Sequence, residues 1–328
     1  MKTEELNASH EHVNAVPLGA VVSVCMITYN HAAFIAQAIE SVLMQKTAFP
    51  FELCIGEDGS SDGTRDICLK YAEKYPNQIR LFLRDKADKI FYNGKPTGKK
   101  NGILTRAACR GKYIAMLEGD DFWIDERKLQ MQYELMESAP DVGICCTRAI
   151  KRFTKSDVDQ VYPVYRSEGV PQSSFFFLRT NIATASLLYR RSFERREFTL
   201  NPQVLLGDWA LLVSLTEDGK NCAMLPVVTA VYRKHDGGFW TGCAIESSDK
   251  LRISIQAAEA YLRMNPADTV KPLERSVRQL KRKLKLSEAG VCGFRRPLSI
   301  IRIVGLYETA IFYFQLIHER IQISVLKR

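Results

Sequence analysis

The sequence predicts an α/β fold, in which a mainly parallel β-sheet is flanked by helices and followed by a basic, helical C-terminal region. Three observations predict it. Short, apolar, β-branched runs alternate with segments of helical periodicity, acidic residues follow several of these runs, and the last part of the chain is both helical in pattern and rich in Lys and Arg. Alternating strands and helices are typical of a mainly parallel sheet that is covered by helices.

The first predicted unit is a strand followed by a helix. Val21–Ile27 is short, β-branched and almost wholly apolar, which is typical of a parallel strand covered on both faces. Between Ala33 and Gln45, apolar residues recur at helical spacing. A strand-then-helix unit of this kind begins a doubly wound sheet.

The same alternation continues along the chain, and no repeat or low-complexity tract interrupts it. The further predicted elements are the strand Phe51–Ile55, the helix Thr64–Tyr75, the strands Ile79–Leu83 and Tyr113–Leu117, the later strand Ala183–Tyr189, a helix that opens at Asp208 and the hydrophobic segment Val227–Tyr232. With 328 residues the chain can form one sizeable core and an appendage. We therefore predict a flexible leader over residues 1–18, one α/β domain over 19–246 and a basic helical region over 247–328.

The net charge of +9 is concentrated at the C-terminal end of the chain. From Lys271 to Arg328 there are 13 Lys or Arg residues against four Glu, so the rest of the chain is neutral overall. A nucleic-acid-binding protein would be expected to carry positive charge across the face of its folded domain. The charge pattern therefore argues against nucleic acid as a partner and favours a membrane or protein contact through the C-terminal region.

The nine cysteines show the pattern of neither a disulfide framework nor a zinc site. Cys25 and Cys54 lie within apolar runs, Cys145 and Cys146 are adjacent, and there is no C-x-x-C pair. The N-terminal residues have neither the basic region nor the apolar region of a signal peptide. We therefore expect reduced thiols and a cytoplasmic location.

The last segment, from Pro297 to Arg328, is apolar but is interrupted by Arg302, Glu308 and Glu319. A membrane-spanning helix needs about 20 largely uncharged residues, so we do not expect this segment to span a membrane. Two interpretations stay open. The segment is either a helix that lies on the anionic inner face of the cell membrane, or a helix that packs on protein, including a second copy in a dimer.

Acidic residues cluster in the loops that follow the predicted strands. In open α/β sheets, ligands bind at the carboxyl ends of the strands. Residues 57–63 and 118–121 contain Asp58, Asp120 and Asp121, and no Arg accompanies these residues within their loops. Such carboxylates would repel one another unless a cation lay among them.

Hard carboxylate oxygens favour Mg²⁺ or Mn²⁺, and these ions keep open positions for the phosphates of a substrate. The loops therefore predict a divalent metal and a diphosphate substrate. The alternative is that both loops are ordinary Asp-Gly and Asp-Asp turns. That alternative fits residues 57–63 as well as the metal does, and fits residues 118–123 less well, since they follow a buried strand directly.

Four blocks of the sequence are matched by motifs of one known family, namely Val22 to Asn30, Glu57 to Thr64, Gly98 to Ile103 and Gly111 to Trp123. They resemble, in this order, the first strand, the nucleoside-binding turn, the Gly-x-Ala-Arg-Asn segment and the strand that leads into the D-x-D metal motif of the family 2 glycosyltransferases, which have the GT-A fold. With two later blocks they span about residues 20 to 242 in the family's order. Gly207 to Trp209 and Tyr232 to Trp240 resemble the acceptor-side blocks of the bacterial cell-surface polysaccharide branch. Glu118 stands where the leading Asp of D-x-D is usual, and Lys100 stands where Arg is commoner, with the loss of bidentate geometry.

The resemblance implies an inverting glycosyltransferase that moves a sugar from a nucleotide diphosphate donor to an acceptor hydroxyl. It implies that Asp58 reads the nucleobase, and that Asp120 and Asp121 handle the ribose and a Mn²⁺ or Mg²⁺ ion that neutralises the leaving diphosphate. Asp208 would be the general base that takes the proton of the attacking hydroxyl. His235 would lie near the diphosphate as a further metal ligand, although a surface histidine in a Gly-rich loop is an equal alternative.

The remaining implied roles concern the two substrates. The donor-binding set is Thr28, Tyr29, Asn30, Glu57, Asp58, Lys100, Asn101 and Asp120. Trp209 and Trp240 would stack on sugar rings on the acceptor side, with core packing as the alternative. The expected partners are a nucleotide diphosphate-sugar, with a UDP-sugar favoured, and a saccharide or lipid-linked saccharide from cell-surface polysaccharide or glycolipid synthesis.

Two other functions remain alternatives. A sugar nucleotidyltransferase also binds nucleotide sugars, but it would leave Asp208 without a role, and the identity of the product separates the two. A non-catalytic module would bind the donor without turnover. A dehydrogenase is a poor alternative because Gly-x-Gly-x-x-Gly does not follow the first strand.

Overall fold

The structure is a computed structural model, and its chain divides into two units, Met1–Cys243 and Ala244–Arg328. The structure describes residues 10–85, 89–92, 95–154, 159–162, 182–194, 211, 215 and 221–236, together with nine single positions between 252 and 285. The predicted boundaries of the leader, the α/β domain and the C-terminal region stay predictions.

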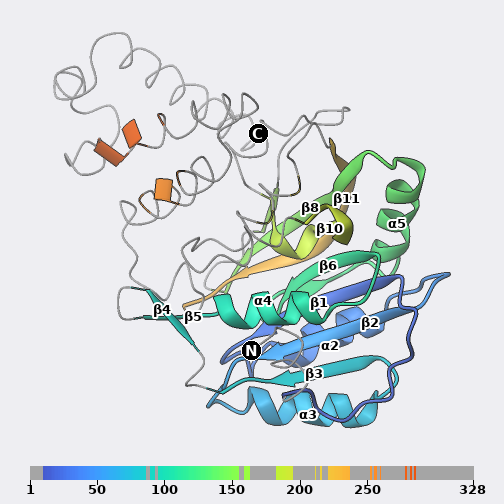
Figure 1. Cartoon of the computed structure of the whole chain (residues 1–328). Helices are drawn as coiled ribbons and strands as arrows, with labels where there is room; N and C mark the ends of the chain where they lie inside the picture. The colour runs from blue at the N-terminus through green and yellow to red at the C-terminus, as the bar shows by residue number, and fades with distance from the viewer. Residues whose placement is uncertain are drawn as a thin grey trace. The chain divides into compact units, whose positions relative to one another are not determined.

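The first unit is built on a mixed sheet whose first half is parallel (Figure 1). The parallel half has the strand order β3-β2-β1-β6, formed by β1 (Val22–Thr28), β2 (Phe51–Glu57), β3 (Ile79–Leu83) and β6 (Tyr113–Glu118). These are the first four predicted strands, each confirmed to within two residues at either end. Their mostly apolar sequences match their burial within the sheet, where all but one residue of each strand is buried.

The second half of the sheet continues from β6 through β10, β8, β11 and β7. Its strands are β10 (Leu188–Arg190), antiparallel to both β6 and β8 (Val142–Phe153), then β11 (Asn221–Lys234), parallel to β8, and β7 (Phe122–Trp123), antiparallel to β11. The short strand β9 (Gln160–Tyr162) pairs with β8. A separate hairpin of β4 (Ile90–Tyr92) and β5 (Lys95–Thr97) protrudes from the sheet in Figure 1.

Helices cover both faces of this sheet. Val24 and Met26 of β1 pack in one apolar cluster with residues of α2 (Ile35–Leu43), α3 (Thr64–Lys74) and α5 (Lys128–Ser138). Cys25 points into the cluster of the opposite face, where α4 (Lys99–Ala108) lies against β1 and β2. This covering of both faces explains why successive residues of β1 are all apolar or buried.

The predicted strand Ala183–Tyr189 is wrong over its first half. Thr184–Ser186 forms the short 3₁₀ helix η2, and only Leu188–Arg190 is a strand. The indole N–H of Trp123 donates to the carbonyl of Ala185 at 2.8 Å, and the Gln132 amide donates to that of Ser186 at 2.9 Å. These side-chain donors take the place of the partner strand that a β conformation would require.

The described positions of the second unit are helical. Within this unit Ile255 is buried, and Lys281 pairs with Glu259 at 2.6 Å. Among the described residues of both units, none of the helices combines the length and the apolar character that a bilayer span requires. The seven cysteines that the structure describes are buried free thiols.

Candidate active site

The sheet register brings the three predicted loops to one edge. Thr28, at the end of β1, lies opposite Glu57 of β2, and Ile27 lies opposite Glu118 of β6. The loops after these three neighbouring strands therefore meet at the carboxyl edge, where open α/β sheets bind ligands.

Hydrogen bonds join the first two loops. Asn30 adopts a left-handed backbone conformation with φ of 54°, which Asn tolerates better than most residues. Its backbone N–H donates to the Ser60 hydroxyl at 2.9 Å, and its side-chain carbonyl accepts from the Ser61 N–H at 3.0 Å. Asn30, which is predicted to bind the sugar donor, therefore links the two loops, and its side-chain carbonyl is used for this contact.

Glu57 also serves the loop that it begins. The carboxylate is fully buried, accepts a hydrogen bond from the Ser60 N–H at 2.6 Å and pairs with Arg65 of α3. Both oxygens are therefore used to form the turn. Its predicted contact with the donor stays a prediction.

Asp58 and Tyr29 form one side of the site, and Lys89 lies between them. The ammonium of Lys89 is 3.4 Å from a carboxylate oxygen of Asp58 and 3.1 Å from the centroid of the Tyr29 ring. Burial raises the pKa of Asp58 to about 6, although the charge of Lys89 opposes that rise. Lys89 was not predicted, because no motif or periodicity around it signals a site.

Asp120 and two histidines form the other side of the site. A carboxylate oxygen of Asp120 is 3.0 Å from Nε2 of His235 and 3.7 Å from Nε2 of His31. Burial raises the pKa of Asp120, but the His235 hydrogen bond and the two histidine charges outweigh burial, so the pKa lies below its ordinary value. The structure thus brings the predicted residues Asp120 and His235 together.

His31 lies between Asp120 and the end of β1. Its Nδ1 is 3.2 Å from the hydroxyl of the predicted residue Thr28, and its Nε2 faces Asp120. Burial, the largest effect, lowers the pKa of His31 and favours the neutral ring. Sequence reasoning missed His31, although its position directly after the Thr28-Tyr29-Asn30 loop could have indicated it.

Asp121 has a different environment from its neighbour Asp120. Its side chain is buried and accepts a hydrogen bond from the backbone N–H of Arg233 at 2.8 Å. Burial, with the charges of Asp120 and Glu118, raises its pKa well above the ordinary value. In the structure Asp121 links the loop after β6 to β11 through this hydrogen bond. Its predicted contact with a metal stays a prediction.

Arg233 makes a further contact between β11 and the loop after β6. Its guanidinium donates to the backbone carbonyl of Asp120 at 2.6 Å and pairs with Gln37 of α2. It also lies over the rings of Phe34, at 5.1 Å, and Phe122, at 4.2 Å. Arg233 stands in the block from Tyr232 to Trp240, but the sequence does not predict its contact with the Asp120 loop.

Lys100 and Asn101 lie in the first turn of α4. The Asn101 amide donates to the carbonyl of Gly56 at 2.8 Å, and Asn101 is 2% exposed. A Cβ at Gly56 would collide with the side chains of Asn101 and Thr105, so the glycine permits this close packing. Asn101 therefore fixes α4 beside the site, and Lys100 is half-buried at its start.

In the structure, basic side chains accompany two of these carboxylates. Lys89 accompanies Asp58, and histidines accompany Asp120. The partners come from distant parts of the chain, which the loop sequences do not reveal. Asp208, Trp209 and Trp240 lie outside the described residues.

Asp120 and His235 fit a divalent ion that is shared with a substrate. Within the described ranges there is no group of three or more His, Cys, Asp or Glu side chains arranged to hold a metal. A carboxylate and an imidazole can still hold Mn²⁺ or Mg²⁺ when substrate phosphates and water complete the coordination, which is how Mg²⁺ is commonly bound.

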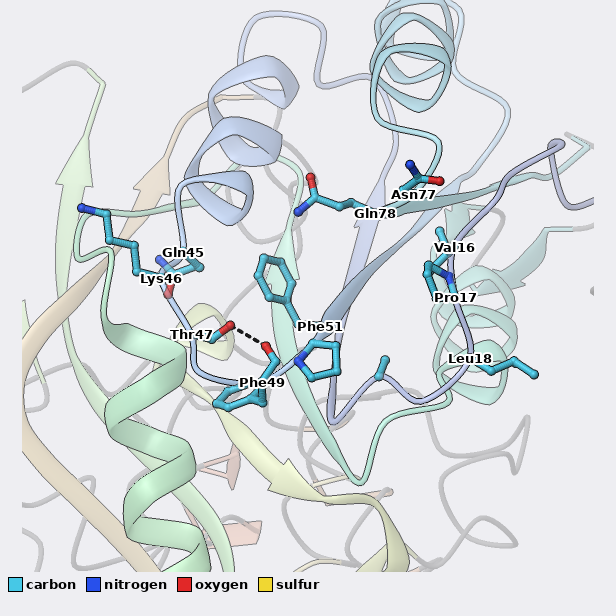
Figure 2. A pocket seen from close by; sticks show the side chains of 12 residues that line it. Val16, Pro17, Leu18, Gln45, Lys46, Thr47, Phe49, Phe51, Asn77 and Gln78 are labelled. Carbon is cyan, nitrogen blue, oxygen red and sulfur yellow. Dashed lines mark hydrogen bonds between the residues drawn. The ribbon is translucent and has the colours of Figure 1, made fainter.

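A cavity of about 520 Å³ lies at the opposite edge of the sheet (Figure 2). Phe51 and Gln78, at the amino ends of β2 and β3, line it together with Pro17 and Phe49. Of the predicted site residues that the structure describes, none lines this cavity. Because this cavity lies at the amino ends of the strands, it is not the ligand site that the carboxyl-edge loops would form.

The sequence model described as glycosyl transferase family 2 matches residues 23–196. An uncharacterized protein of Mycobacterium tuberculosis is 32% identical over 219 residues, which are 67% of this chain and 60% of that protein. The Escherichia coli protein named UDP-Glc:alpha-D-GlcNAc-diphosphoundecaprenol beta-1,3-glucosyltransferase WfgD is 35% identical over 116 residues, 35% of this chain and 41% of that protein. The chain thus spans about 60% of the length of its mycobacterial relative.

Among solved structures, the mannosyltransferase PcManGT from Pyrobaculum calidifontis, in complex with GDP-Man and Mn²⁺, matches with a TM-score of 0.55 and 15% identity over 97% of this chain and 86% of that one. This likeness shows the fold. Because the family's sequence model covers residues 23–196, more than half of the 328 residues, and the fold agrees, this chain belongs to glycosyl transferase family 2 and has its GT-A fold.

Proposed function

We propose that this chain is a metal-dependent, inverting glycosyltransferase of the bacterial cell-surface polysaccharide type. It moves a sugar from a nucleotide diphosphate donor, with a UDP-sugar favoured, to a hydroxyl of a saccharide or lipid-linked saccharide. The observation that carries the proposal is the carboxyl-edge site, where Tyr29 and Asp58 lie on one side and Asp120 and His235 lie on the other.

Tyr29 and Asp58 have the chemistry of a nucleobase subsite. Tyr29 is 38% exposed, its aromatic ring can stack on a base, and the adjacent carboxylate of Asp58 can accept from a base N–H. The name of the Escherichia coli relative includes UDP-Glc, whereas the archaeal structure contains GDP-Man, so the nucleobase is itself a variable of the test.

Asp120 and His235 would hold the divalent ion together with Asp121, which keeps its predicted role as a metal ligand. The ion would supply positive charge to the leaving diphosphate. Arg233 would keep the Asp120 loop in place through the Asp120 carbonyl and the backbone bond to Asp121. Thr28, Asn30, Glu57, Lys100 and Asn101 complete the proposed donor site.

Asp208 is the proposed general base, and Trp209 and Trp240 are proposed to contact the acceptor. In one direct displacement, the acceptor oxygen bonds to the anomeric carbon while the bond to the diphosphate oxygen breaks, and the hydroxyl proton passes to Asp208. The configuration at the anomeric carbon therefore inverts.

The test is an assay of the purified chain with a panel of nucleotide diphosphate-sugars, Mn²⁺ and saccharide or polyprenyl-linked acceptors, with product analysis by mass spectrometry and NMR. We expect a glycosylated acceptor of inverted configuration and a free nucleoside diphosphate. Formation of a nucleotide sugar from a nucleoside triphosphate and a sugar phosphate would instead identify a nucleotidyltransferase.

Asp208→Asn separates an enzyme from a binding module. We expect this variant to bind the donor with unchanged affinity but to transfer sugar at least about 100-fold more slowly, which is an ordinary effect for a lost general base. Glu73→Gln, on the exposed surface of α3, is the matched control and should keep full activity. Donor binding without transfer by the wild-type chain, with every acceptor tried, would support the non-catalytic module.

A further inference from the structure

Lys89 stands where a nucleobase would have to lie. Its ammonium is 3.1 Å from the centroid of the Tyr29 ring and 3.4 Å from the carboxylate of Asp58. Its side chain is only 5% exposed, and that of Asp58 is 7% exposed, so the pair is enclosed rather than lying on the surface. The face of Tyr29 and the carboxylate of Asp58 are therefore both covered by one side chain of the protein itself.

A stacked base and this ammonium cannot share the same space. A base that stacked on the Tyr29 ring beside the Asp58 carboxylate would need the ring face that Lys89 covers, and its N–H would need the oxygen that Lys89 approaches. A planar base offers an aromatic face to the ring and a hydrogen-bond donor to the carboxylate. It can thus replace both contacts that Lys89 makes, which a phosphate or a sugar hydroxyl could not do.

We propose that Lys89 is an internal occupant of the nucleobase subsite, and that the nucleotide donor displaces it on binding. This inference rests on the proposed function, since it assumes that Tyr29 and Asp58 receive the base. Lys89 holds the subsite in the donor-free protein by two contacts, a cation–π contact with Tyr29 and an ion pair with the buried carboxylate of Asp58.

Lys89 stabilises the donor-free protein and weakens donor binding by a measurable factor. A buried carboxylate is unfavourable without a positive partner, and Lys89 supplies one when no donor is bound. Since donor binding requires the open form, the apparent dissociation constant exceeds the intrinsic one by the reciprocal of the open fraction. Removing the ammonium should therefore tighten nucleotide binding, although it deletes a cation beside an anionic ligand.

Isothermal titration calorimetry with UDP and with uridine provides the first test, on the wild-type chain, Lys89→Met and Lys70→Met. Lys89→Met keeps the length of the side chain and removes its charge, and Lys70, exposed on α3, is the matched control. The titration is done at pH 8.5, because burial raises the pKa of Asp58 to about 6 and the loss of Lys89 raises it further. We expect Lys89→Met to bind both ligands about tenfold more tightly, which corresponds to an open fraction of about one tenth, and Lys70→Met to match the wild type.

Amine acylation followed by mass spectrometry provides a second test that needs no variant. In the donor-free protein Lys89 should react slowly relative to Lys46, whose side chain is 70% exposed. Addition of UDP should increase the labelling of Lys89 and leave that of Lys46 unchanged. A ligand that merely covered Lys89 would decrease its labelling, which would overturn the proposal.

The binding data separate a failure of the displacement of Lys89 from a failure of the proposed function. If the wild-type chain binds UDP but Lys89→Met binds it equally or more weakly, Lys89 is a supporting residue of the subsite, and only the displacement proposal is overturned. If the wild type and both variants bind none of UDP, GDP, ADP and CDP, the proposed function fails together with the inference drawn from it.

Discussion

Two neighbouring aspartates of the site have opposite environments. Asp120 faces His235 and His31, and its pKa lies below the ordinary value because the His235 bond and the histidine charges outweigh burial. Asp121 is buried against the backbone of Arg233, and burial raises its pKa well above the ordinary value. The two carboxylates are therefore expected to contribute differently to metal binding.

This difference can be measured with Asp120→Asn and Asp121→Asn. Asp120→Asn should lower the rate of transfer at a fixed Mn²⁺ concentration by about 100-fold or more, because a metal ligand contributes several kcal/mol. Asp121→Asn should lower it by about tenfold, because the amide oxygen can still accept from the Arg233 N–H at the same position.

The accompanying measurement is the affinity for Mn²⁺ in the presence of UDP, followed by electron paramagnetic resonance of the free ion. Asp120→Asn should weaken Mn²⁺ binding, and Asp121→Asn should leave most of it intact. Equal loss in the two variants would show that Asp121 is a direct ligand of the same rank as Asp120.

At the scale of elements, α5 carries a buried lysine beneath the site. Lys128 is fully buried, donates to the Gln132 side chain at 2.6 Å and lies 4.3 Å from the ring of Trp123, which follows the Asp120 loop in β7. Gln132 in turn donates to the carbonyls of Cys145 and Ser186. The network therefore joins α5, strand β7 after the Asp120 loop, and the antiparallel part of the sheet.

Burial lowers the pKa of Lys128 from its ordinary value of 10.5 to about 7. Between these pH values the unfolded chain holds a proton on this lysine that the folded chain has released. Folding stability from this group therefore rises with pH across the window and is lost as the pH falls towards 7. Urea unfolding of wild type and Lys128→Met at pH 7 and pH 9 should show a larger rise with pH in the wild type.

Lys70→Met, which changes an exposed lysine of α3, should keep the pH dependence of the wild type. The difference between wild type and Lys128→Met isolates Lys128, because the other ionisable groups are the same in both proteins. The same pH slope in wild type and Lys128→Met would show that Lys128 remains protonated in the folded protein.

At the scale of the whole molecule, the C-terminal region holds the entire positive excess of the chain. The 13 basic residues from Lys271 onward face four Glu, whereas the remainder is balanced. A lipid-linked acceptor would lie at a membrane surface, and a basic amphipathic segment is the ordinary way to reach an anionic one. We therefore propose peripheral binding at the inner face of the membrane as the role of residues 247–328.

Sedimentation with vesicles checks this role. The full chain should bind vesicles that contain phosphatidylglycerol and should not bind vesicles of phosphatidylcholine alone, and added salt should weaken the binding because surface charges are screened. The double variant Arg295→Gln and Arg296→Gln should bind less well. Binding that is absent at low salt, together with a dimer in analytical ultracentrifugation, would favour packing on protein instead.

The parallel half of the sheet could be predicted because its strands are coded locally. A strand buried on both faces is apolar along most of its length, so Val22–Thr28 and Phe51–Glu57 are recognisable without knowledge of their neighbours. The segment Thr184–Ser186 was not predictable in this way, because the donors that hold its carbonyls come from Trp123 and Gln132.

The sequence by itself determined that acidic loops follow the buried strands of a family 2 glycosyltransferase, since strand patterns and motif blocks are properties of contiguous residues. Only the tertiary structure decided which basic side chains accompany those acids. Lys89 reaches Asp58 from the edge of a separate hairpin, and His235 reaches Asp120 across 115 positions of the chain. The pairing of distant side chains depends on how strands are ordered in the sheet, which local patterns do not contain.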